Sequence, residues 1–114
     1  MVRIYHNPRC RKSREALKML QDHGEKIEII EYLKNPPSVT ELSALVSKMN
    51  IKPEDLVRKN EALFKDKYRG KSFSDSEWIK IMVNNPVLIE RPIIVKNKQV
   101  ILARQPEKVN NLYN

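Results

Sequence analysis

Cysteine, glycine and aromatic residues are scarce in this 114-residue sequence, which has one Cys, two Gly, one Trp, four Tyr and two Phe. A single cysteine cannot form an internal disulfide, and it is typical of a protein of the reducing cytosol. One cysteine and two histidines are too few for a closed zinc site, so we expect no bound metal. No apolar run approaches the roughly 18 residues of a membrane span, and no apolar leader begins the chain. These absences predict a cytoplasmic protein that does not enter a membrane.

The charge balance is basic, with 22 Lys and Arg against 14 Asp and Glu. An excess of this size could indicate a nucleic-acid partner. The basic residues are, however, spread from Arg3 to Lys108 and mixed with acidic ones, and few aromatic side chains are available to stack on bases. We therefore do not expect nucleic-acid binding, and a site for a small anion fits the composition better.

A β-α-β unit is predicted at the start of the chain. Residues 2–6 (VRIYH) and 26–32 (KIEIIEY) alternate apolar and polar side chains, as half-buried strands do. Between them, residues 11–22 have helical periodicity, and Gly24 follows at the position where glycine often ends a helix. A right-handed crossover would make the two strands parallel.

The middle of the chain, approximately residues 38–84, is expected to form a helical insert. Ser38 with Glu41, and Ser74 with Glu77, have the spacing of capping boxes that begin helices. In each case apolar residues follow at helical intervals. The insert therefore adds helices, and no strands, between the first two strands and the rest of the sheet.

Two short β-rich runs, residues 93–95 and 100–103, are expected to form a hairpin around the polar turn 96–98. Residues 105–112 are expected to form a terminal helix. The order βαβ, helical insert, ββα predicts an α/β fold of the thioredoxin-like type with a mixed four-stranded sheet. At this length we expect a single domain over residues 1–114.

The segment between the first strand and the first helix carries the most chemical information. Cys10 lies in residues 6–13 (HNPRCRKS), at the carboxyl end of a strand, where open α/β sheets bind ligands. The helix N-terminus and the neighbouring Arg9, Arg11 and Lys12 favour a thiolate, and free N–H groups there can bind an oxyanion. A lone cysteine is otherwise more often a small buried hydrophobic residue, but its charged neighbours argue against simple burial.

Four segments resemble, in the same order, motifs of the glutaredoxin-dependent arsenate reductase (ArsC) family. They are the loop His6-x-x-x-Cys10-x-x-Ser13-Arg14 and residues 56–60 (LVRKN), 85–94 (NPVLIERPII) and 103–106 (ARQP). The similarity covers essentially the whole chain. Four motifs in register are far more specific than one cysteine beside a basic residue.

The resemblance implies an oxidoreductase that reduces arsenate to arsenite through Cys10. In such enzymes the matching cysteine attacks arsenate and forms a covalent adduct, glutathione displaces it, arsenite leaves, and glutaredoxin reduces the mixed disulfide. No cofactor would remain bound, and glutathione and glutaredoxin would act as external reductants. The partners implied are therefore a small oxyanion, glutathione and glutaredoxin, and we expect a monomer.

Three arginines receive a role from the same resemblance. Arg58, Arg91 and Arg104 are expected to hold the oxyanion, and a guanidinium suits this role because it stays protonated and offers forked donors. His6 would lower the pKa of the thiol or orient the loop, although it could equally do no more than hydrogen-bond the loop backbone.

Three further residues are expected to support the loop. Thioredoxin-like folds carry a cis proline that faces the active cysteine, and Pro92 matches that place. Asn7 and Ser13 are expected to act in turn formation and capping near the loop.

Two alternatives of different kinds remain at this point. Arg11 and Lys12 stand where arsenate reductases of the family commonly have glycine and threonine, and the loop looks closer to a sister branch of ArsC-like proteins, so a reductase with another substrate is one alternative. The other is a transcriptional regulator of the same fold that binds the RNA polymerase α subunit. Such regulators sense disulfide stress through a Cys-x-x-Cys pair, and Ser13 at the second position excludes that switch.

Overall fold

A computed structural model describes residues 1–113. The chain divides into two compact units, one made of residues 1–35 together with the chain from residue 91 onward, and the other of residues 36–90. Each unit is described by itself. The second unit corresponds to the predicted helical insert with slightly wider bounds, while the assignment of the whole chain to one domain stays a prediction.

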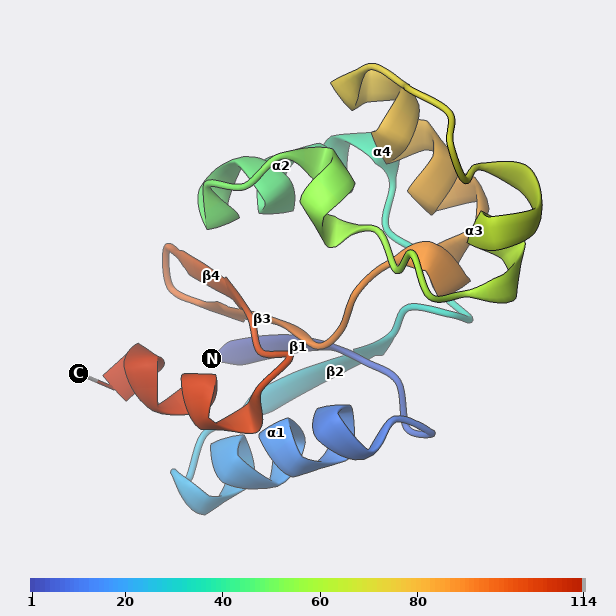
Figure 1. Cartoon of the computed structure of the whole chain (residues 1–114). Helices are drawn as coiled ribbons and strands as arrows, with labels where there is room; N and C mark the ends of the chain where they lie inside the picture. The colour runs from blue at the N-terminus through green and yellow to red at the C-terminus, as the bar shows by residue number, and fades with distance from the viewer. Residues whose placement is uncertain (114) are drawn as a thin grey trace. The chain divides into compact units, whose positions relative to one another are not determined.

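The first unit contains a mixed four-stranded sheet with strand order β2-β1-β3-β4 (Figure 1). Strand β1 (Val2–His6) pairs in parallel with β2 (Ile27–Glu31) and antiparallel with β3 (Ile93–Lys96), which pairs antiparallel with β4 (Gln99–Leu102). Helix α1 (Arg11–Asp22) makes the connection from β1 to β2. This is the predicted βαβ plus ββ arrangement.

The turn between β3 and β4 is tighter than predicted. Lys96 pairs with Gln99, so both strands reach one residue further into the polar turn and leave Asn97 and Lys98 as a two-residue connection. Asn97 has φ 56°, and asparagine is one of the residues that tolerate this left-handed conformation. Lys96 and Gln99 have polar side chains, so the sequence pattern places them in the turn. Strand pairing is made by backbone groups, which pair whatever the side chain is.

One face of the sheet packs against α1 and the C-terminal segment (Figure 1). The buried apolar cluster there consists of Val2, Ile4, Ala16, Leu20, Ile94, Ala103, Val109 and Leu112. Burial of each Val, Leu or Ile side chain of this cluster contributes about 1.5–3 kcal/mol to the free energy of unfolding. Because α1 and β1 both contribute to this core, the core sets their relative position, and therefore the geometry of the loop that joins them.

The terminal segment is a 3₁₀ helix, η3 (Pro106–Tyr113), where an α-helix over residues 105–112 was predicted. Its first turn is closed by a hydrogen bond from the Lys108 N–H to the Gln105 carbonyl, three residues back. Val109 and Leu112 are the residues that η3 buries. A spacing of three places both on one side of a 3₁₀ helix, because side chains at i and i+3 eclipse there.

The second unit contains the remaining helices: α2 (Val39–Met49), η1 (Pro53–Leu56), α3 (Ala62–Lys67), α4 (Asp75–Asn84) and η2 (Pro86–Leu88). The Ser38 hydroxyl accepts the Glu41 N–H, and Ser74 with Glu77 forms a complete capping box, so both predicted helix starts are confirmed. Within residues 1–113 no helix is both long enough and apolar enough to cross a bilayer.

Candidate active site around Cys10

The loop before α1 is held in one shape by its own polar groups. The Asn7 carbonyl accepts the Cys10 N–H at 3.0 Å, and the Asn7 Oδ1 accepts the Arg9 N–H at 3.0 Å. Arg14 donates from Nη1 to the Pro8 carbonyl at 3.0 Å. Helical side chains tilt toward the helix N-terminus, which is why Arg14 reaches back to a loop that precedes its own helix. The sequence alone assigns no role to Arg14, although its position near the start of the helix is a signal for such a contact.

Cys10 is the N-cap residue of α1 and is half-buried. The Cys10 side chain makes no capping hydrogen bond that meets ordinary distance and angle limits. Burial tends to raise the pKa of the thiol, but the backbone N–H of Ser13, the charge of Arg91 and the backbone N–H of Lys12 together outweigh it and lower the pKa below its ordinary value. The first turn of α1 contains no acidic residue that would oppose this effect. Cys10 is therefore placed to ionise more readily than an ordinary cysteine.

Ser13 links His6 to the loop. Its side chain is fully buried, and its hydroxyl accepts the Asn7 N–H at 3.1 Å and lies 2.6 Å from His6 Nδ1. His6 is 6% exposed. Ser13 thus offers its backbone N–H to the Cys10 thiol and its hydroxyl to His6 and Asn7 at the end of β1. In this way it links the end of β1 to the start of α1.

Burial lowers the pKa of His6; the Glu31 carboxylate opposes this effect and the Arg14 charge adds to it. We expect His6 to be neutral at pH 7, with its proton on Nε2 and Nδ1 accepting the Ser13 hydroxyl. The unfolded chain then takes up this proton at higher pH than the folded one, so the contribution of His6 to stability is lost as pH falls below about 6.5. Proton–nitrogen NMR of the ring should show a midpoint below that value, and a midpoint above it would contradict the description.

Replacing Ser13 by alanine should lower the free energy of unfolding by about 1–3 kcal/mol, because the half-buried Asn7 N–H and the buried His6 Nδ1 lose their hydrogen-bond partner. Urea denaturation measures this loss. Ser43→Ala, at an exposed position of α2, is the matched control and should stay within about 0.5 kcal/mol of the parent chain. Equal effects of the two substitutions would show that the Ser13 hydroxyl does not hold the loop.

Arg91 and Pro92 directly precede β3, and the peptide bond between them is cis. The cis bond agrees with the expectation for Pro92. Both the charge of the Arg91 guanidinium and its hydrogen bond to the sulfur favour the thiolate. Arg91 is one of the three arginines expected from the family resemblance to hold the oxyanion, and the structure adds that its guanidinium acts on the Cys10 sulfur itself.

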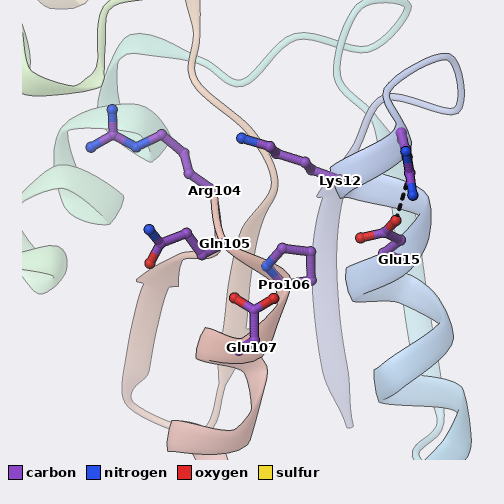
Figure 2. Close-up of a pocket in the computed structure, with 7 residues that line it drawn as sticks. Lys12, Glu15, Arg104, Gln105, Pro106 and Glu107 are labelled. Atoms are coloured by element: carbon purple, nitrogen blue, oxygen red, sulfur yellow. Dashed lines mark hydrogen bonds and ion pairs between the residues drawn. The ribbon is translucent and has the colours of Figure 1, made fainter.

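Arg104 lies just after β4 and lines a surface pocket of about 310 Å³ with residues of the first turn of α1. The pocket is lined by Arg11, Lys12, Glu15, Arg104, Gln105, Pro106 and Glu107. In Figure 2, Lys12 extends from α1 toward the segment that carries Arg104. The fold therefore brings Arg104 to the helix end that carries Cys10, and it adds two carboxylates there that the sequence had not indicated.

Arg58 belongs to the second unit. Its N–H donates to the Leu88 carbonyl at 2.7 Å, and its guanidinium makes ion pairs with Glu61 at 2.6 Å and Glu90 at 3.6 Å. Its predicted contact with an oxyanion at Cys10 stays a prediction.

Among residues 1–113, no group of three or more His, Cys, Asp or Glu side chains is arranged to hold a metal ion.

The fold and this loop define a thioredoxin-like α/β protein with one cysteine, of lowered pKa, at the N-terminus of its first helix. The model of the ArsC family matches residues 5–112. The chain belongs to the ArsC family.

Individual relatives agree with this assignment. An Escherichia coli K12 protein called uncharacterized protein YfgD is 40% identical over 110 residues, which are 95% of this chain and 92% of that protein. An arsenate reductase of Acidiphilium multivorum is 38% identical over 109 residues, 95% of this chain and 77% of that enzyme. The solved structure of an arsenate reductase from Vibrio cholerae has a TM-score of 0.92 at 41% identity and covers 96% of this chain and 95% of its own.

Proposed function

We propose that this protein is a cytoplasmic thiol oxidoreductase that reduces arsenate to arsenite through a covalent adduct on Cys10. The observation that carries the proposal is the environment of the Cys10 sulfur, where two backbone N–H groups and the Arg91 guanidinium favour the thiolate. The same donors suit the oxyanion that the thiolate would attack. The similarity to proteins named arsenate reductase supports the choice of arsenic as the reacting centre.

In the first step the Cys10 thiolate attacks arsenic(V). A sulfur–arsenic bond forms, and one arsenate oxygen leaves as water after it has been protonated. Two anions must approach each other in this step, so cationic groups lower its barrier. Arg91 and Arg104 are the arginines of the first unit that we propose to hold the oxyanion.

In the second step a glutathione thiolate attacks the sulfur of Cys10. A disulfide forms, the sulfur–arsenic bond breaks, and its electron pair stays on arsenic, which leaves as arsenite. Arsenic gains two electrons and two thiols become one disulfide. A glutaredoxin thiol then attacks the glutathione sulfur and releases Cys10 as a thiolate. The chain itself needs no second cysteine for this cycle.

The test is NADPH oxidation coupled through glutathione reductase, glutaredoxin and glutathione, with arsenate as the variable substrate. We expect turnover that depends on arsenate and on both thiol donors. A chain whose Cys10 is rapidly alkylated but which gives no arsenate-dependent turnover would contradict arsenate as the substrate and leave a reductase for another compound. An inert Cys10 together with stoichiometric capture of the RNA polymerase α subunit would instead favour the binding-protein alternative.

A further inference from the structure

We propose that the pocket between the first turn of α1 and the start of η3 is the binding site for the resolving thiol, a small peptide thiol with two carboxylates and one ammonium, as in glutathione. The inference rests on the proposed function, since it names the site at which that reaction would receive its second thiol. It concerns the side chains of Lys12, Gln105 and Glu107, which have no assigned role in the reaction with arsenate.

The position of the pocket is the first argument. The Lys12 backbone N–H lowers the pKa of the Cys10 thiol, and the Lys12 side chain lines the pocket. The pocket thus begins one residue into the helix that Cys10 caps. The pocket is lined by Arg11 and Lys12, the two residues that follow Cys10, so a peptide bound there could place its thiol toward the Cys10 sulfur and make the attack effectively intramolecular.

The size of the pocket is the second argument. Its volume of about 310 Å³ lies at the lower end of the ~300–1,000 Å³ common for small-molecule sites. A tetrahedral oxyanion alone would leave most of this space unfilled. A tripeptide is a better match, and the open, solvent-exposed side chains of Lys12, Gln105 and Glu107 suit a ligand that must enter and leave in every cycle.

The mixture of charges is the third argument. The Lys12 ammonium can pair with a carboxylate of the ligand, whereas Glu15 and Glu107 would repel a simple anion. Arg11 forms a 2.8 Å ion pair with Glu15, so Glu107 is the carboxylate more available to an ammonium group. The Gln105 amide offers both a donor and an acceptor to a peptide bond. A ligand with charges of both signs fits this lining better than arsenate does.

The pocket explains the two side chains that replace glycine and threonine in the loop resemblance. Arg11 orders Glu15, and Lys12 supplies a cation on the α1 side of the pocket (Figure 2). Small residues at these positions would remove both features. The consequence for the reaction is an added contact for the thiol donor.

Binding can be tested without any chemistry by using S-methylglutathione, which keeps the charges of glutathione and cannot form a disulfide. Amide NMR shifts on titration into the full chain should fall on Lys12, Gln105 and Glu107. Lys12→Glu and, separately, Glu107→Gln should weaken this binding about 3- to 10-fold, the range of exposed charge pairs. Lys18→Glu, an equal charge reversal further along α1 and outside the pocket, should not change it.

The outcomes separate this site from the proposed function. Saturable shifts at the pocket with no arsenate turnover would support the site and refute arsenate reduction. Arsenate turnover with no shifts at the pocket, or with equal KM values for glutathione in Lys12→Glu and Lys18→Glu, would refute the site alone. Inorganic sulfate at equal ionic strength should not reproduce the shifts, and if it does, the pocket is a general anion site and the inference fails.

Discussion

Replacing Cys10 by serine should reduce arsenate turnover by at least about 1,000-fold, the scale on which an enzyme loses activity without its nucleophile. A serine hydroxyl stays protonated near neutral pH, so the groups that favour the Cys10 thiolate have no anion to stabilise. Oxygen also cannot form the mixed disulfide through which the two electrons pass. The coupled NADPH assay measures the loss.

This substitution separates chemistry from folding unusually well. Cys10 is the N-cap of α1, and serine is among the preferred N-cap residues, so Cys10→Ser should leave the melting temperature unchanged or slightly raised. Thiol alkylation should disappear at the same time, because Cys10 is the only cysteine of the chain. Undiminished turnover in a folded Cys10→Ser chain would mean that the reaction does not pass through this sulfur.

Replacing Arg91 by alanine should raise the pKa of Cys10 and weaken the reaction with arsenate. The charge of Arg91 and its hydrogen bond to the sulfur both lower that pKa, so their removal leaves burial opposed by the backbone N–H groups alone. The pH at half-maximal iodoacetamide labelling should therefore move upward. The loss in kcat/KM for arsenate should be about 100-fold, as for removal of one preorganised donor to a developing anion.

Arg9→Ala is the matched control for this prediction. Arg9 is exposed and directly precedes Cys10, and its backbone N–H, which the substitution keeps, makes the bond to Asn7. Its labelling curve should stay close to that of the parent chain. Equal curves for Arg91→Ala and the parent would contradict a role for Arg91 at the sulfur, and equal shifts for both variants would indicate only a general loss of positive charge.

The sequence predicts the fold best where local signals are strong. Residues 2–6 and 11–22 form a strand and a helix with the predicted bounds, because alternation and helical periodicity both reflect one buried face. Gly24 follows the helix with φ 75°, as expected of a glycine just beyond a helix end. The 3₁₀ form of η3 was not predicted, since the choice between three- and four-residue turns depends on how Val109 and Leu112 meet the core.

The sequence predicts the loop that contains Cys10 better than it predicts the residues that other segments bring to that loop. Residues 6–13 contain the cysteine, the helix start and the serine that supports them, all within a few residues of one another. The contact of Arg91 with the sulfur depends on the antiparallel pairing of β1 with β3, which no local pattern encodes. The pocket likewise requires α1 and η3 to pack together, so Lys12 and Glu107 could be seen as neighbours only in the folded chain.

The most direct test is one turnover of the pure chain with arsenate and glutathione in the absence of glutaredoxin, followed by arsenite measurement and intact-protein mass spectrometry. We predict one equivalent of arsenite for each chain and one glutathionyl group on Cys10, removed when glutaredoxin is added. Arsenite formed while Cys10 remains unmodified, or no arsenite from a chain whose Cys10 is fully ionised, would contradict the proposed chemistry.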